Sequence, residues 1–133
     1  MKIRIMIGCL ILMLSAFAGS AWAGTEGVYN TFYGAGAGAN TIGGGSATAQ
    51  EGDTFIGVNA GVTNTNGIDN TFVGDGAGFS NTSGNYNTFL GLNAGYKNTG
   101  SISTGSGNTF LGTSAGYSNI TGNYNTFVGL QSG

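Results

Sequence analysis

"NTFLGLNAG" at residues 87–95 returns as "NTFLGTSAG" at 108–116 and, more loosely, as "NTFVGDGAG" at 70–78. The Asn/Asp-Thr-Phe triplet that opens this phrase begins at Asn30, Asp53, Asn70, Asn87, Asn108 and Asn125. Successive spacings are 23, 17, 17, 21 and 17 residues, so the unit is 17 residues long and two units carry insertions in Gly/Ser-rich sequence. A fixed period that is interrupted only by loop-like insertions indicates stacked structural repeats.

The order of residues within a unit predicts short strands. Each unit reads Asn-Thr-Phe-aliphatic-Gly, two variable residues and Ala-Gly, with no helical spacing. Gly at two fixed places disfavours a helix, whereas a short extended segment closed by Gly suits a strand and a turn with positive φ. Strand-containing coils of about 17 residues stack at about 4.7 Å in β-solenoids. We therefore predict an all-β fold, a parallel β-solenoid (β-roll) of about six 17-residue rungs.

In a stack of identical rungs, residues at the same position of the repeat lie directly above one another. The Asn residues that precede the strands are expected to form an amide ladder, and the Phe residues an aromatic core ladder. This structural core ladder consists of Phe32, Phe55, Phe72, Phe89, Phe110 and Phe127.

The residue after each Phe forms a second apolar stripe. Neighbouring residues of a strand point to opposite faces, so this stripe faces away from the Phe core. Its members are Tyr33, Ile56, Val73, Leu90, Leu111 and Val128. An exposed stripe of this length favours self-association, and three parallel solenoids around one axis would bury both stripes, so we expect a homotrimer. The alternative is a second internal layer within one wide coil.

The N-terminal 23 residues have the pattern of a secretory signal peptide. Lys2 and Arg4 precede an apolar run over residues 5–18, and the small-residue site Ala21-Trp22-Ala23 follows. We expect cleavage between Ala23 and Gly24, which divides the chain into a signal peptide (1–23) and a repeat domain (24–133) without a stable membrane span. The mature chain is then secreted or displayed at the cell surface, on the outer surface of a bacterium.

The charge of residues 24–133 excludes two classes of partner. Lys97 is their single basic residue against five acidic ones. One lysine cannot neutralise a phosphate backbone or an anionic membrane surface, so we expect no nucleic-acid binding and no binding to anionic lipids.

The residue types that most often carry catalysis are absent. The sequence has no His, and its one Cys lies within the apolar run of the signal peptide. Two pairs of carboxylates, Glu51 with Asp53 and Asp69 with Asp75, are candidates for a glycosidase-like pair or a calcium site. Asp53 stands where the other units have Asn, which favours an Asn-ladder variant. The Gly-rich stretch 34–45 lacks the Lys-Ser/Thr of a phosphate-binding loop, so we expect no enzyme activity, no cofactor and no metal.

The tyrosines and the inserted loops are the candidates for recognition of a ligand. Tyr86, Tyr96, Tyr117 and Tyr124 are of the type found in carbohydrate- and protein-binding faces. Because each recurs in phase with the repeat, we favour a role in capping the core at the rung corners. The two insertions break the phase and are better candidates for contact with a host or surface glycan or protein. The equivalent sequons at Asn81 and Asn119 are attributed to the repeat rather than to glycosylation.

The repeats resemble the head domains of trimeric autotransporter adhesins and the shaft repeats of bacterial tail-fibre-like surface proteins. The resemblance rests on "NTFVGDGAGFSNTSGNY", "NTFLGLNAGYKNTG" and "NTFLGTSAGYSNITGNY" and covers residues 30–133. It implies a parallel β-roll or β-prism that forms a homotrimer and acts in adhesion or as a spacer. The chain departs from these families in having no heptad stalk and no anchor barrel. It stops within a unit, at "NTFVGLQSG", so we expect either a longer native chain or an open rung for assembly.

Three functions follow as hypotheses. The leading one is an exported structural or adhesive protein, a solenoid rod or fibre segment for attachment. The second is a self-polymerising, amyloid-like matrix subunit, because Asn/Gly richness and open strand edges favour polymerisation. The third is an ice-binding solenoid, because the Thr residues of the repeat would stack in a ladder. The Thr residues share their face with the apolar stripe, which argues for their burial.

Overall fold

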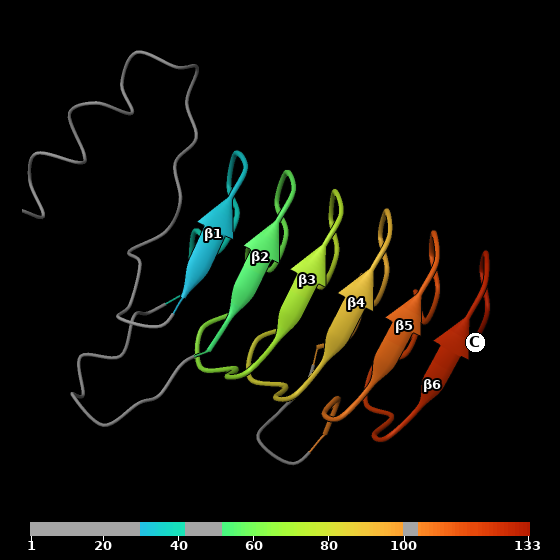
Figure 1. The fold of residues 1–133 in the computed structure, drawn as a ribbon. Helices are drawn as coiled ribbons and strands as arrows, with labels where there is room; N and C mark the ends of the chain where they lie inside the picture. The colour runs from blue at the N-terminus through green and yellow to red at the C-terminus, as the bar shows by residue number, and fades with distance from the viewer. Residues whose placement is uncertain (1–29, 42–51, 100–103) are drawn as a thin grey trace, which may run out of the picture.

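The computed structural model describes residues 30–41, 52–99 and 104–133. They form six short strands, which lie side by side in one parallel sheet in chain order (Figure 1). The strands are β1 (Thr31–Tyr33), β2 (Thr54–Ile56), β3 (Thr71–Val73), β4 (Thr88–Leu90), β5 (Thr109–Leu111) and β6 (Thr126–Val128). The chain makes one coil, here called a rung, from each strand to the next. The predicted all-β parallel solenoid is thereby confirmed.

The predicted signal peptide and its cleavage site between Ala23 and Gly24 lie outside the described residues. Within the described ranges, no helix has the length and hydrophobicity needed to cross a bilayer.

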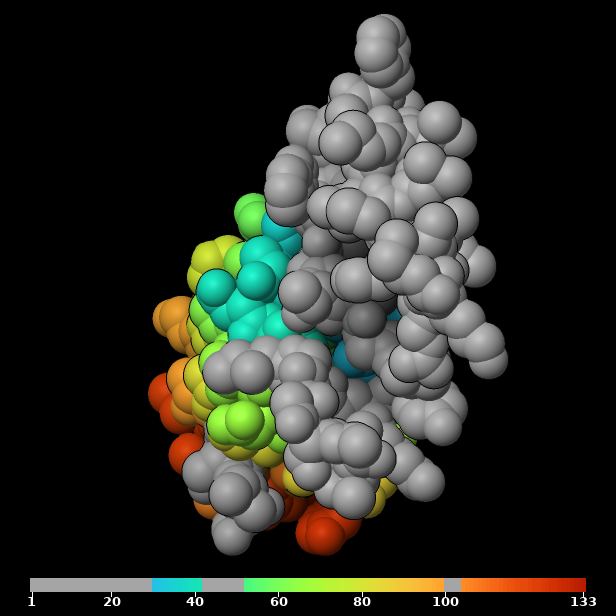
Figure 2. Space-filling view, turned by 90° about the vertical axis from the view of Figure 1, so that its left-hand side faces the viewer, coloured from blue at the N-terminus to red at the C-terminus, as the bar shows by residue number. Residues whose placement is uncertain are grey.

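Figure 2 looks along the stack from its β1 end, and the coloured atoms of later rungs lie behind those of the first.

Strand register is the same in every pair, with Thr opposite Thr and Phe opposite Phe. For β4 and β5 the partners are Thr88 with Thr109, Phe89 with Phe110 and Leu90 with Leu111. This pair and the β1/β2 pair span the two insertions, yet both keep that register. The extra residues are therefore accommodated outside the strands, as expected for loops of a stacked repeat.

The core is a single file of phenylalanine rings. Neighbouring rings from Phe32 to Phe127 have centroids 4.8–5.0 Å apart and planes within 13° of parallel. Beside them lies a column of fully buried alanines, Ala37, Ala60, Ala77, Ala94 and Ala115. Since parallel strands stack at about this spacing, the rung repeat itself sets the distance between the rings.

Two glycines per unit are required by sterics. Gly91 has φ +137°, and a Cβ there would lie 2.6 Å from the carbonyl carbon and oxygen of Gly112 in the next rung. A Cβ on Gly95 would lie 2.4 Å from Cε2 of Phe89. The first glycine lets the backbones of neighbouring rungs approach, and the second lets the chain close over the ring of its own rung.

The predicted Asn ladder is present at the start of the strands. The N–H of Asn87 donates to Oδ1 of Asn70 (3.0 Å), and the N–H of Asn108 donates to Oδ1 of Asn87 (3.0 Å). Nδ2 of Asn87 donates to the carbonyl oxygen of Gly105 (2.8 Å). Each buried amide thus satisfies backbone groups of the coil, which lowers the cost of burying both.

A second amide ladder, which the sequence analysis missed, follows eleven residues after the first. It consists of Asn64, Asn81, Asn98 and Asn119. Nδ2 of Asn81 donates to Oδ1 of Asn64 (2.9 Å) and to the carbonyl oxygen of Gly84 (3.0 Å). The side chains of Asn64, Asn81 and Asn98 are fully buried. The interior of the coil is therefore half apolar and half a hydrogen-bonded amide array.

Candidate functional site

The outward side of the sheet is a regular surface that runs along all six strands. Because each Phe points inward, the Thr before it and the residue after it point outward. We call the surface formed by these two columns over β1–β6 the strand face. Thr31, Thr88, Thr109 and Thr126 are exposed, and Thr54 and Thr71 are half-buried. The Thr ladder is therefore largely open in the single chain, and its expected burial remains a prediction for the assembled protein.

The apolar column of the strand face lies open in the single chain. The exposed fractions are 71% for Tyr33, 39% for Ile56, 44% for Leu90, 42% for Leu111 and 65% for Val128, and Val73 is half-buried. Within the described residues, no second layer of the coil covers this column. The strand face carries no charged side chain in either column.

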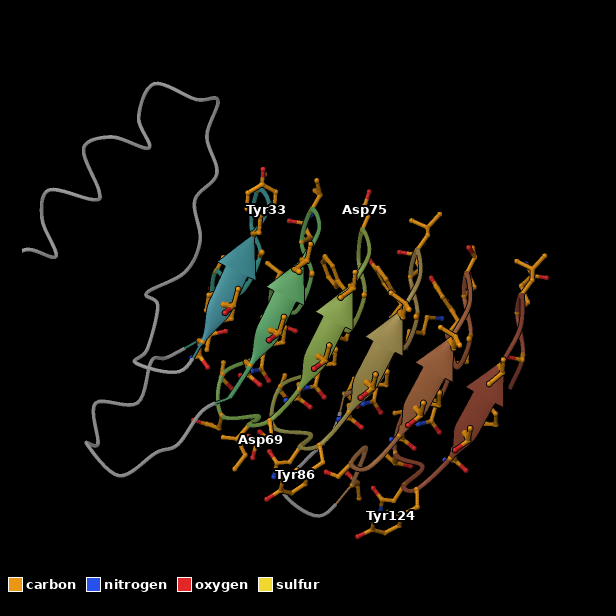
Figure 3. All side chains as sticks on the ribbon, in the orientation of Figure 1. Tyr33, Asp69, Asp75, Tyr86 and Tyr124 are labelled. Atoms are coloured by element: carbon orange, nitrogen blue, oxygen red, sulfur yellow. The ribbon has the colours of Figure 1, made fainter. Side chains whose placement is uncertain are left out.

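A further exposed column lies just past the strands and widens this apolar surface. Val58, Leu92 and Leu130 follow the first glycine of their units and are 46%, 48% and 73% exposed. Asp75 occupies the same position in the third rung and lies at the same edge of the sheet as Tyr33 (Figure 3). The sequence analysis missed this column, although its signal was present in the recurrence of apolar residues two places after the aliphatic one.

Asp53 is a member of the first amide ladder. Its carboxylate is fully buried; Oδ1 accepts the N–H of Asn70 (2.8 Å) and Oδ2 accepts Nδ2 of Asn64 (2.9 Å). Its own N–H donates to Oδ1 of Asn30 (2.9 Å). The carboxylate therefore performs the acceptor role that Asn performs in neighbouring rungs, and no face of it opens to a substrate.

The other acidic candidates do not converge. Asp69 lies at the edge where the strands begin and Asp75 at the opposite edge, with β3 between them (Figure 3). Glu51 lies outside the described residues. Across residues 30–41, 52–99 and 104–133 no group of three or more His, Cys, Asp or Glu side chains is placed to hold a metal ion.

The four tyrosines separate into two columns. Tyr96 and Tyr117 stack on one another (5.3 Å between centroids), and Tyr96 also stacks on Phe79 (4.7 Å). The ammonium group of Lys97 lies 5.1 Å from the centroid of the Tyr117 ring. These half-buried rings form a structural row along the rod.

Tyr86 and Tyr124 instead precede the strands and project from the opposite edge to Tyr33 (Figure 3). They are 63% and 85% exposed. The expectation that all four tyrosines cap the core is therefore wrong for this pair.

Other sequence candidates have structural explanations or fall outside the described ranges. Asn81 of the first sequon is buried in the second amide ladder, so its amide is inaccessible to a glycosyltransferase in the folded chain. Residues 34–41 of the Gly-rich stretch form the turns of the first rung. Residues 42–51 and 100–103 of the two Gly/Ser-rich insertions lie outside the described residues.

No protein-family model, no curated protein and no solved structure gives a significant match to this chain. The candidate site therefore has to be interpreted from its own geometry.

Proposed function

We propose that this protein is an exported structural and adhesive protein of the bacterial surface, in which solenoid rods associate as trimers and serve in attachment. The observation that carries the proposal is the strand face, an uncharged and largely exposed surface that runs along all six strands. The proposal gives the chain no catalytic role and no cofactor. It gives the chain no nucleic-acid partner, since Lys97 is the single basic residue after position 23.

A second copy of the chain is the occupant that fits the strand face. Among the described residues, eight of the eleven exposed large hydrophobic side chains belong to the strand face or to the column beside it, so the apolar exposure is concentrated on one side. Burial of such a surface is favourable in proportion to its area. Two copies also have the same rung spacing, so the apolar columns of one rod can match those of another along their whole length.

Leu90→Asp is expected to dissociate the assembly while the coil stays folded. Leu90 lies in the middle of the strand face and is 44% exposed in the single chain. An unpaired carboxylate buried at this place would cost more than the roughly 2–7 kcal/mol that an unpaired neutral polar group costs. Light scattering coupled to size-exclusion chromatography should give the mass of a trimer for the wild type and of a monomer for the variant, with unchanged circular dichroism.

Ile120→Asp is the matched control, because Ile120 is 52% exposed but lies in a turn away from the strand face. This variant should remain trimeric. A monomeric wild type, or equal effects of the two substitutions, would contradict association through the strand face. Open-ended, concentration-dependent polymers of the wild type would instead favour the matrix-subunit hypothesis.

A second candidate function, ice binding, is favoured by the exposure of the Thr column. The Thr hydroxyl and methyl groups repeat at the rung spacing on a parallel sheet, next to an aliphatic column, and four of the six are exposed. A regular array of this kind orders water only while it is open to solvent, whereas a trimer that buries the strand face removes it. Ice binding therefore requires an open strand face, whereas the trimer requires a buried one.

Ice recrystallisation separates these two candidates. An ice-binding rod should inhibit recrystallisation as a monomer and lose most of this inhibition in Thr88→Lys, which places a long charged side chain in the middle of the array. Thr121→Lys, at an exposed position in a bend of the fifth rung, should leave it unchanged. Absence of inhibition by the wild type would leave the trimeric rod as the single proposal.

A further inference from the structure

Tyr86 and Tyr124 occupy a backbone position that disfavours aromatic side chains. Their φ angles are 58° and 56°, in the left-handed region. The equivalent residues of the second and fourth rungs are Asp69 (φ 56°) and Gly107 (φ 68°). Asp and Gly tolerate this region, whereas a bulky residue is strained in it. Backbone strain at an exposed position is better explained by a functional role of the side chain than by a role in folding.

The fold does not require the two rings. The N–H of Tyr86 donates to the carbonyl oxygen of Ile68 (3.1 Å), and the N–H of Tyr124 donates to that of Ser106 (3.0 Å). Gly107 makes the equivalent bond to the carbonyl oxygen of Asn85 (2.9 Å) without any side chain. With 63% and 85% of their side chains exposed, the rings contribute little burial to the core. The backbone of this turn therefore forms with or without them.

We propose that Tyr86 and Tyr124 form a binding site for an extended, neutral, β-1,4-linked polysaccharide chain. Both rings lie along one edge of the rod, on the same column of the repeat (Figure 3). They are two rungs apart, which corresponds to about 10 Å at the spacing of parallel strands. The disaccharide repeat of an extended β-1,4-linked glycan has about this length. Alternate sugars of one chain can therefore stack on successive tyrosines.

The residue of the rung between the two tyrosines leaves the space between their rings open for a sugar chain. Gly107 has no side chain, and a Cβ at this position would lie 2.7 Å from Cδ1 and 2.9 Å from Cε1 of Tyr124. The edge of the Tyr124 ring thus rests on the backbone of the preceding rung, which limits its freedom. A ring that is held in place before binding loses less conformational entropy when a sugar stacks on it.

The polar groups of this edge suit a neutral sugar. Oδ1 of Asn85 accepts the N–H of Ile68 (2.9 Å), and within the described ranges Nδ2 of Asn85 remains available as a donor to a hydroxyl group. Lys97, the one basic residue of the described ranges, lies over Tyr117 in the other aromatic row. Asp69, in the same column as the two tyrosines, would repel an anionic glycan. The site therefore selects against charged polysaccharides.

The test is a calorimetric titration of the purified protein with cellohexaose and with the hexamer of N-acetylglucosamine. At least one hexamer should bind. The corresponding disaccharide should bind at least about tenfold more weakly, because it stacks on one tyrosine whereas the hexamer stacks on both. Tyr86→Asn and Tyr124→Asn should each weaken binding of the hexamer by about tenfold. Asn tolerates the left-handed backbone, so both variants should stay folded by circular dichroism.

Tyr117→Asn is the matched control, since Tyr117 lies outside the strand face, in the separate aromatic row with Tyr96 and Phe79. It should bind the hexamer like the wild type. Failure of both hexamers to bind, unchanged binding by the Tyr86 and Tyr124 variants, or equal binding of the curved α-1,4-linked maltohexaose would overturn the inference. The inference rests on the proposed attachment role for its biological purpose. Its failure would leave the trimer untouched, because light scattering tests the strand face and not this edge.

Discussion

Gly91→Ala is expected to lower the free energy of unfolding by about 3–5 kcal/mol, because it combines backbone strain with a contact that cannot relax. The φ of +137° is available to glycine and is strongly unfavourable for alanine. The new Cβ would also lie 2.6 Å from the carbonyl group of Gly112. That group is backbone, so relief requires the separation of β4 from β5. Urea denaturation followed by circular dichroism measures the change.

Gly129→Ala separates the two contributions. Gly129 has the equivalent position in the last described rung, with φ +123°, and a Cβ there meets nothing within 4 Å. This variant carries the backbone strain alone and should lose about 1–3 kcal/mol. If the two glycines prove equally sensitive, the close approach of the rung backbones is not what demands glycine.

Phe89→Ala is expected to cost about 3–5 kcal/mol as a truncation in the middle of the core ladder. Phe89 is fully buried, with ring centroids 4.9 Å away on one side (Phe72) and 4.8 Å on the other (Phe110). The neighbouring rings cannot close the gap, because the strand hydrogen bonds hold the rungs at their spacing. Thermal and urea unfolding should both report the loss.

Phe127→Ala is the control for the ladder, because this ring is partly buried and stacks on Phe110 alone. Its truncation should cost about half as much or less. Equal losses at the two positions would mean that stacking on both sides contributes little and that each ring is stabilised within its own rung.

The strand half of each unit could be predicted from the sequence because its signals are strong and local. Each unit has a Phe followed by an aliphatic residue and Gly, and the units recur at a fixed spacing. This recurrence predicts that the Phe residues stack on one another. The alternation of side chains along a strand then places Leu90 on the opposite face from Phe89. Asp53 was also predictable as a ladder member, since a carboxylate can replace an amide as an acceptor.

The turn half of the unit was harder to predict because its residues are polar and its geometry depends on left-handed backbone positions. Asn81 and its equivalents look like loop residues in sequence, and their burial becomes evident from the hydrogen bonds between rungs. The two tyrosine columns likewise recur with the same period. The structure separates them because Tyr86 has φ 58° and projects from the turn before β4, whereas Tyr96 stacks on Phe79. A period says which residues are equivalent but not which way they point.

The uniform register of the sheet has a consequence at the level of the gene. Because every rung offers its neighbours the same Thr, Phe, Gly and Asn positions, a unit can be joined to any other unit without a new kind of contact. Gain or loss of one whole unit would change the reach of the rod by about 5 Å and leave its cross-section unaltered. Length is thereby a trait that can vary in small heritable steps while each intermediate remains foldable.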